Sequence, residues 1–337
     1  MDPELSVLLP YRDAEQTLDD CLWSIRRQTL QHFEVLAIND VSRDNSVQRV
    51  LDHARSDPRI RLLDNPRPGL VNALNLGLEH SRSPLIARMD ADDLMLPNRL
   101  DRQCTHLRDS PDLTLLGCQV RLFPEELIQQ GLREYIQWQN SCLDPETIAA
   151  EIYIESPFAH PSLTFRRDAI RRAGGYRNGD FPEDYELWLR LHRLGHRMEK
   201  LPEVLLEWRD SETRLSRTDP RCGRAAFDRL RADYLARDPL VRSRRKELVI
   251  WGAGRKTRQR CNLLLEQGYE VSAWIDIDPR KIGNRLQGAQ VHPPDWLWRL
   301  PRPFVLVYVN NHGARGLIGR ELTKMGYRRR RDYLMVG

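Results

Sequence analysis

The stretch SVLLPYRDAEQTLDDCLWSIRRQTLQHFEVLAIND, residues 6–40, determines how the first half of the chain folds. It begins with a short apolar run and ends with a second one, FEVLAIND, and both runs are typical of buried strands. Between the two runs, four apolar residues recur at helical spacing on one face: Leu18, Cys21, Leu22 and Ile25. A strand, a helix and a second strand in this order predict a parallel pair joined by a right-handed crossover.

The same alternation continues beyond this stretch. IRLLDN at 60–65 and PLIARMD at 84–90 are two further predicted strands, and a predicted helix precedes each of them. Four strands in this order predict an α/β fold in which helices flank a mostly parallel sheet. Ligands of such sheets bind beyond the carboxyl ends of the strands. Polar residues at these ends are therefore the first candidates for a functional site.

Beyond residue 96 the pattern is less regular until a second α/β unit begins. Helical spacing is visible only in short stretches, at 97–109, 143–151 and 183–195. An arginine-rich stretch follows, and ELVIWGAGRK then opens a new strand–turn–helix pattern. We expect a first domain at 1–215, a basic helical linker at 216–246 and a smaller Rossmann-like domain at 247–337.

The composition is that of an ordinary globular protein. The 337 residues include 53 lysines and arginines against 48 aspartates and glutamates, a formal net charge of +5. We expect no nucleic-acid partner from this mild excess, while peripheral association with the inner face of a membrane and self-association both stay open. The six cysteines show no metal spacing, and no apolar run reaches about 18 residues. We therefore expect a cytoplasmic protein with reduced thiols.

Three carboxylates crowd into four positions directly after the fourth predicted strand. In IARMDADDLMLP, residues 86–97, they are Asp90, Asp92 and Asp93. Such hard oxygen ligands favour Mg²⁺ or Mn²⁺, and these ions usually keep positions open for substrate phosphates. The alternative is that Asp92 or Asp93 caps a helix starting near Pro97. The residues alone leave both interpretations open.

A second acidic group occurs in FPEDYELWLRL, where Glu183, Asp184 and Glu186 begin an amphipathic helix. A carboxylate here is a candidate general base, although acids in a first helical turn are also favoured by the helix dipole. His160, in PFAHPS upstream, is a candidate substrate contact or a structural histidine.

Taken together and in order, the motifs resemble glycosyltransferase family 2, which consists of inverting enzymes with the GT-A fold. The resemblance extends over residues 5–216. It rests on SVLLPYRDAEQTLDDCLWSIRRQT, EVLAINDVSRDNS, NPRPGLVNALNLGLEHSRSPLIARMDADD, PNRLDRQ, SPFAHPSLTFRR, GGYR, FPEDYELWLRL and WRDSETRLSR. The resemblance implies a nucleotide-sugar site in the first half of the chain and a divalent cation, Mn²⁺ or Mg²⁺, as cofactor.

The resemblance also implies roles for the donor side. Pro10 and Tyr11 match the strand end that holds the nucleobase, and Asp40 matches the carboxylate that accepts hydrogen bonds from the base. Asp90 matches the first acid of the D-x-D motif, which faces the ribose or the metal, and Asp92 matches the acid that ligates the cation. The alternative for Tyr11 is a core aromatic.

On the acceptor side, Asp184 matches the family's catalytic base, and Glu183 is expected to bind or orient the acceptor. His160 lies in a segment that borders the acceptor site. Ser211 stands where many relatives carry a histidine that contacts the metal or phosphate, so strict metal dependence stays open.

Several arginines are further donor-site candidates. Arg88 is expected to pair either with a carboxylate or with the donor phosphate. Arg214, together with Arg209 and Arg217, is a candidate for contacting the diphosphate.

The C-terminal α/β unit has only part of a dinucleotide fingerprint. Gly252 and Gly254 fit a tight turn and Asp276 ends the next strand, but Thr257 occupies the third glycine position. We therefore do not expect NAD as a cofactor.

The expected function is an inverting glycosyltransferase in polysaccharide or glycoconjugate synthesis. It would move a sugar from a nucleotide-diphosphate donor, expected to be a UDP-sugar, to a hydroxyl of a carbohydrate or glycolipid acceptor. The alternatives are a non-catalytic nucleotide-sugar or NAD-type sensor, and a nucleotidyltransferase. The last is disfavoured because no glycine-rich phosphate loop follows the first strand.

Overall fold

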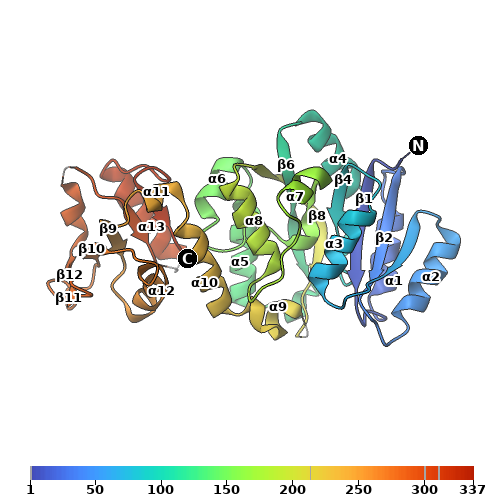
Figure 1. Cartoon of the computed structure of the whole chain (residues 1–337), viewed down its shortest axis with the longest axis horizontal. Coiled ribbons are helices and arrows are strands. Elements are labelled where there is room, and N and C mark those ends of the chain that lie inside the picture. Colours follow the sequence, from blue (N-terminus) through green and yellow to red (C-terminus); the bar gives the residue numbers. More distant parts are fainter. Residues whose placement is uncertain (1, 213, 300, 310–311) are drawn as a thin grey trace. The chain divides into compact units, whose positions relative to one another are not determined.

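A computed structural model describes residues 2–212, 214–299, 301–309 and 312–337 (Figure 1). The chain divides into two compact units. The first unit consists of Met1–Ile148 and Pro157–Asp219, and the second consists of Ala149–Ser156 and Pro220–Gly337. No helix in these described ranges is long and apolar enough to cross a membrane.

The first unit is built on an eight-stranded sheet with strand order β3-β2-β1-β4-β7-β6-β8-β5. The strands are β1 Leu5–Tyr11, β2 Phe33–Asn39, β3 Ile60–Asp64, β4 Leu85–Arg88, β5 Leu94–Met95, β6 Leu113–Phe123, β7 Thr164–Arg166 and β8 Arg197–Arg209. The first four strands are parallel, as the sequence predicts. Strands β7 and β5 run antiparallel to their neighbours, whereas β6 and β8 are parallel to each other.

Helices cover this sheet and supply the rest of its core. They are α1 Leu18–Arg26, α2 Ser46–Ser56, α3 Leu70–His80, α4 Arg99–Asp109, α5 Gln130–Ser141, α6 Pro145–Glu151, α7 Arg167–Arg172, α8 Glu183–Arg193 and α9 Leu215–Thr218, with 3₁₀ turns at Glu125–Leu127 and His160–Ser162. The apolar face predicted for α1 is buried against alternate side chains of β1. On α3, a Cβ added to Gly77 would come within 2.8 Å of Leu8 and Ile38, so the glycine permits close helix packing.

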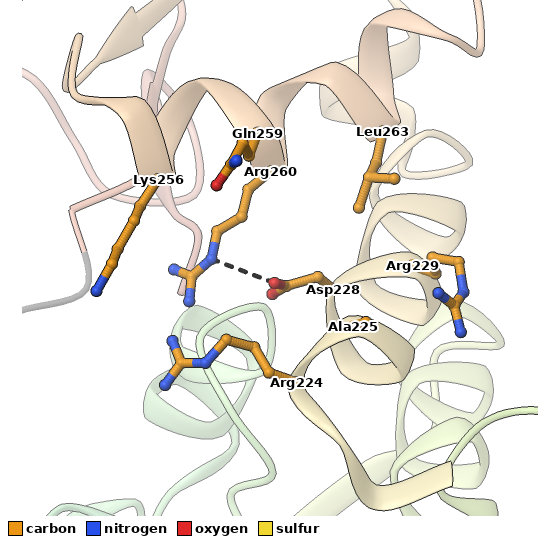
Figure 2. Close-up of a pocket in the computed structure, with 8 residues that line it drawn as sticks. All are labelled: Arg224, Ala225, Asp228, Arg229, Lys256, Gln259, Arg260 and Leu263. Atoms are coloured by element: carbon orange, nitrogen blue, oxygen red, sulfur yellow. Dashed lines mark ion pairs between the residues drawn. The ribbon is translucent and has the colours of Figure 1, made fainter. Parts of the chain in front are cut away.

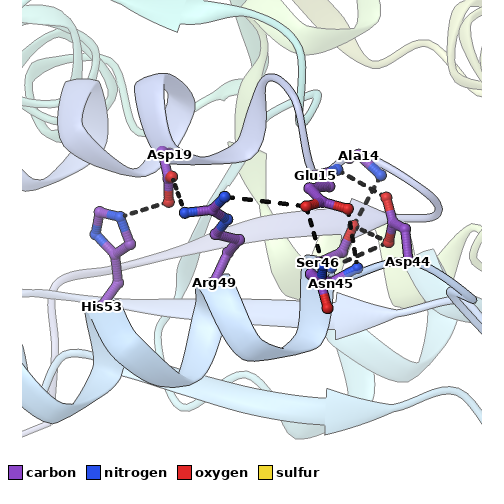
Figure 3. Close-up of polar contacts among 8 residues, drawn as sticks. All are labelled: Ala14, Glu15, Asp19, Asp44, Asn45, Ser46, Arg49 and His53. Atoms are coloured by element: carbon purple, nitrogen blue, oxygen red, sulfur yellow. Dashed lines mark hydrogen bonds and ion pairs between the residues drawn. The ribbon is translucent and has the colours of Figure 1, made fainter.

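A polar network fixes the loop after β1 to the start of α2 (Figure 3). The backbone amide of Ala14 donates to Ser46 Oγ at 2.8 Å, and that of Glu15 donates to Asp44 Oδ2 at 2.9 Å. The amide of Ser46 donates to Asp44 Oδ1 at 3.0 Å, which forms an Asx turn. The chain ends of β1 and β2 are therefore held in fixed positions next to each other.

The second unit has a six-stranded sheet with strand order β11-β12-β10-β9-β13-β14. The strands are β9 Leu248–Trp251, β10 Val271–Ile275, β11 Arg285–Leu286, β12 Ala289–His292, β13 Val305–Val307 and β14 Tyr333–Met335, and all pairs are parallel except β11 with β12. Its helices are α10 Arg224–Leu235, α11 Pro239–Arg242, α12 Arg255–Leu265 and α13 His312–Lys324, with 3₁₀ turns at Pro220–Cys222 and Pro294–Trp298.

The segment expected to be a linker, 216–246, is divided between the two units at Asp219. Its larger part contains α10 and α11 in the second unit, where α10 packs against α12. Apolar residues of α10 such as Leu230 and Leu235 are buried. These buried side chains pack α10 into the core of the second unit.

Candidate active site

The predicted donor residues lie at the carboxyl ends of neighbouring strands. In the parallel sheet, Tyr11 at the end of β1 is opposite Asn39 of β2, and Leu8 of β1 is opposite Arg88 of β4. The amide of Asp40 donates to the Tyr11 carbonyl at 2.8 Å. Parallel pairing therefore brings together residues that are up to eighty positions apart in the sequence.

Asp40 organises the loop that follows β3. Its Oδ1 accepts hydrogen bonds from Asn65 Nδ2 at 2.7 Å and from the Gly69 amide at 2.8 Å. Gly69 has a φ of 122°, a conformation that favours glycine. Pro10 and Tyr11 are buried beside this loop, and the Tyr11 ring is only 3% exposed. In this structure the Tyr11 ring belongs to the core cluster and is not an open stacking surface.

The acidic loop after β4 brings three carboxylates together. Oxygen atoms of Asp90, Asp92 and Asp93 lie within 4.8 Å of one another. The helix-capping alternative is wrong, because α4 begins at Arg99 with Asn98 at its N-cap and β5 lies in between. Asp93 is completely buried, and its Oδ2 has no hydrogen-bond partner among the described residues.

Arg209, at the end of β8, holds this loop in place. Its amide donates to Asp93 Oδ1 at 2.8 Å, and its Nε donates to the Asp92 carbonyl at 2.7 Å. The Arg209 guanidinium also lies over the Phe123 ring at 4.5 Å. The sequence suggested a diphosphate contact for Arg209, but the structure shows it bonded to the acidic loop.

The electrostatics of the acidic loop are unfavourable without a bound cation. Burial, followed by the charge of Asp90, raises the pKa of Asp92 to about 6. Burial and the two neighbouring carboxylates raise the pKa of Asp93 well above its usual range. Three hard oxygen ligands, one of them orphaned, suit Mg²⁺ or Mn²⁺. The residues present therefore fit the divalent cation that the sequence implies.

Arg88 lies between this loop and the second acidic motif. Its side chain is 3% exposed and forms an ion pair with Asp90, whereas its Nε has no hydrogen-bond partner among the described residues. Burial raises the pKa of Asp184 and the guanidinium charge of Arg88 opposes this rise, while burial and the same charge both lower the pKa of His160. The two acidic motifs, about ninety residues apart in the sequence, thus both interact with the buried guanidinium of Arg88.

The second acidic motif forms the first turn of α8. Burial, followed by the charge of Glu183, raises the pKa of the half-buried Asp184 to about 7. Glu186 has a different role, because it pairs with Arg190 at 2.8 Å and with Arg177 at 3.6 Å. The pKa of Asp184 therefore suits proton transfer near neutral pH, whereas Glu186 is engaged in ion pairs.

His160 is buried behind the acid pair. Its Nε2 and the Tyr176 hydroxyl are 2.9 Å apart, and its ring meets Trp188 of α8 edge-on at a centroid distance of 5.8 Å. Burial and the charge of Arg88 lower the pKa of His160 well below its usual value, so the ring is neutral. Sequence reasoning did not single out Tyr176 or Trp188 as partners of this histidine.

Arg214 is positioned by a buried carboxylate that the sequence did not single out. Asp210 follows β8 and pairs with Arg214 at 3.6 Å and with Arg217 at 2.8 Å. Arg214 also lies 4.2 Å over the Trp208 ring. Burial and Asp90 raise the pKa of Asp92, and the charge of Arg214 opposes this rise, so Arg214 interacts with the acidic loop.

Asp276, a candidate dinucleotide-binding residue of the second unit, is hydrogen-bonded within its own unit. The carboxylate of Asp276 accepts hydrogen bonds from the Ala253 amide at 2.8 Å, the Asp278 amide at 2.9 Å and Lys281 Nζ at 3.1 Å. A Cβ on Gly252 would lie 3.1 Å from Thr257 Oγ1. The acid that would bind a ribose is therefore occupied by its own loop, which does not fit a bound dinucleotide.

Comparison with known proteins agrees with the geometry of the first unit. The family model described as Glycosyl transferase family 2 matches residues 6–174, half of the chain. The chain belongs to glycosyltransferase family 2. The enzymes of this family are inverting and use nucleotide-sugar donors, so the protein is a glycosyltransferase.

Named relatives and a solved structure are also similar to this family 2 glycosyltransferase. The amylovoran biosynthesis glycosyltransferase AmsE of Erwinia amylovora is 33% identical over 60% of this chain and 75% of its own. The UDP-Gal:alpha-D-GlcNAc-diphosphoundecaprenol beta-1,3-galactosyltransferase of Escherichia coli is 30% identical over 62% and 75%. S. aureus TarS 1-349, solved with UDP-GlcNAc, has a TM-score of 0.58 and 15% identity over 79% of this chain and 71% of its own. The structural likeness confirms the expected GT-A fold.

Proposed function

We propose that this glycosyltransferase moves a sugar from a UDP-sugar to a hydroxyl of a carbohydrate or glycolipid acceptor in polysaccharide or glycoconjugate synthesis. The observation that carries the proposal is the convergence of both acidic motifs on the buried guanidinium of Arg88. The names of the relatives support UDP as the nucleotide and a saccharide or lipid-linked acceptor.

Asp184 is the proposed catalytic base. A direct displacement at the anomeric carbon needs one group to take the proton from the acceptor hydroxyl as that oxygen attacks. The pKa of Asp184, about 7, lets the carboxylate accept this proton near neutral pH. Glu183 would orient the acceptor, and the neutral ring of His160 would border the acceptor site.

The proposed donor site consists of the carboxyl ends of β1, β2 and β4 and the loop after β8. Asp40 with the backbone at Pro10 and Tyr11, and not the buried Tyr11 ring, would hold the nucleobase, and Arg88 with Arg214 would face the diphosphate.

Asp90 and Asp92 would hold Mn²⁺ or Mg²⁺. When bound, such an ion supplies positive charge that stabilises the departing nucleoside diphosphate.

The place of action follows from the acceptor. A lipid-linked acceptor, as in the name of the E. coli relative, would bring the enzyme to a membrane surface. We therefore propose a cytoplasmic enzyme that works peripherally at the inner face of the membrane.

The test is an isosteric pair of variants assayed for transfer and for product stereochemistry. Asp184→Asn keeps the side-chain shape but removes the base, and we expect about a thousandfold loss of transfer with donor binding retained. Asp180→Asn changes an exposed aspartate of the preceding loop and should leave the rate unchanged. The product of the unmodified enzyme should show inverted anomeric configuration by NMR. Full activity in Asp184→Asn, or a retained configuration, would overturn the mechanism.

A further inference from the structure

Positive charge is concentrated in the second unit. That unit has 25 lysines and arginines against 13 aspartates and glutamates, a formal net charge of +12, whereas the first unit has 28 against 35, or −7. The net charge of +5 for the whole chain is therefore the sum of two units with net charges of opposite sign. A unit with this excess attracts anions.

A cavity of about 330 Å³ lies within the second unit, between α10 and α12 (Figure 2). Its charged lining residues are Arg224, Asp228, Arg229, Lys256 and Arg260. The volume is at the lower end of the range for small-molecule sites, about 300–1,000 Å³. Four cationic side chains and one carboxylate make the cavity strongly positive.

The single carboxylate is already engaged with other partners. Asp228 Oδ1 lies 3.0 Å from Arg231 Nη1, and Asp228 Oδ2 lies 3.3 Å from Arg260 Nε. Within the part of the chain that the structure describes, the side chains of Arg224 and Lys256 form no hydrogen bond or ion pair. Figure 2 shows the charged ends of Arg224, Lys256 and Arg260 directed toward the same space. Burial raises the pKa of the nearby Glu155, and the charge of Arg224 opposes this rise, so a carboxylate balances Arg224 in part.

Arg260 lies deepest in this group, with a side chain 11% exposed. Its Nη1 also donates to the Gly337 carbonyl. Burial lowers the pKa of Arg260, and the charges of Arg231 and Arg224 lower it further. Even with Asp228 in the lining and Glu155 nearby, cationic side chains outnumber the carboxylates at the cavity. An anion between Arg224, Lys256 and Arg260 would offset this excess of positive charge.

We propose that the cavity between α10 and α12 binds a phosphate-bearing anion through Arg224, Lys256 and Arg260. Phosphate fits better than a carboxylate, because its several oxygens and higher charge can accept from three cationic groups at once. The phosphate can belong to a soluble compound or to a lipid headgroup. This site uses none of the residues assigned to sugar transfer, so it stands or falls independently of the proposed reaction.

The experiment measures anion binding by the full chain in EDTA, so that divalent cations play no part. Inorganic pyrophosphate is titrated by calorimetry at low salt, and phosphatidylcholine vesicles with and without phosphatidic acid are used for co-sedimentation. The test variant is Arg224→Ala with Lys256→Ala. The matched control is Arg320→Ala with Lys324→Ala, which removes the same charge from the exposed face of α13 in the same unit.

We expect the test pair to weaken binding by about tenfold or more and the control pair to change it by less than about twofold. Selective loss of pyrophosphate binding identifies a soluble phosphate compound as the ligand. Selective loss confined to vesicles with phosphatidic acid identifies a lipid phosphate. Equal weakening by both pairs would show diffuse surface attraction and overturn the site. Failure of the unmodified protein to bind either probe would do the same.

Discussion

Both units place aspartates just beyond the end of a parallel strand, but in opposite surroundings. After β4, Asp90 and Asp92 crowd together, and burial and repulsion raise the pKa of Asp92 to about 6. After β10, Asp276 accepts hydrogen bonds from two backbone amides and a lysine of its own unit. Position at a strand end is therefore not enough to mark a site. The informative sign is a buried carboxylate that its own fold leaves unsatisfied.

The strongest test of this contrast is catalytic. Asp92→Ala should lower the transfer rate by about a hundredfold or more, because the proposed cation, whose charge would stabilise the leaving diphosphate, would lose one of its ligands. Asp276→Ala should leave the rate unchanged. Initial rates at saturating Mn²⁺ measure both variants. A similar loss in Asp276→Ala would erase the distinction between the two strand ends.

Stability should respond in the reverse order. Asp276→Ala leaves the buried Ala253 amide and Lys281 without their acceptor, which should lower the free energy of unfolding by about 2 kcal/mol. Asp92→Ala removes a carboxylate that its neighbours repel, so the change should stay within about 0.5 kcal/mol of zero or be stabilising. Urea denaturation followed by circular dichroism gives both values. Equal losses would contradict the assignment of Asp276 as structural.

A smaller effect is expected at Arg214. Arg214→Ala should raise the KM for the donor about tenfold with less change in kcat, because the residue is proposed to bind the diphosphate in ground and transition states alike. Arg217→Ala is the matched control, since Arg217 pairs with the same Asp210. If both variants raise KM equally, Asp210 and not Arg214 is the important group.

The smallest effect concerns the pH dependence of stability. The folded-state pKa of Asp184, about 7, lies above its unfolded value near 4, so this residue's contribution to stability is complete below pH 4 and is lost as the pH rises through 7. Asp184→Asn removes the ionisation, so the variant should gain about 1 kcal/mol over the unmodified protein between pH 6 and pH 7. Thermal denaturation at the two pH values measures the gain. A constant difference would mean that Asp184 is ionised throughout this range.

The sequence predicted the first half of the large sheet but not the second. Strands β1 to β4 alternate with helices and pair with parallel neighbours in the same half of the chain, so local patterns were sufficient. Strands β6 and β8 lie about eighty residues apart in the sequence, and their pairing contains register shifts near Gln119. Pro202 further interrupts the alternation in β8. Long-range pairing with irregular register leaves little signal in any short window.

The candidate site was predictable to a similar degree. The acids were visible as motifs because carboxylates crowd together there, whereas Arg209 and Asp210 act through contacts that only the folded chain creates. Asp276 matched a spacing rule, but its hydrogen bonds could not be read from spacing. Asp44 was predictable because its Asx turn is local.

The bond between Arg209 and Asp93 joins residues 116 positions apart, and this has a consequence for the order of events during synthesis. The acidic loop leaves the ribosome early, but the strand end that anchors it leaves after α8, which carries the proposed base, has already been made. A nascent chain therefore contains its acids well before they are held in place. The proposed donor pocket can therefore be completed only after α8 has been synthesised, so an unfinished chain lacks the anchored acidic loop.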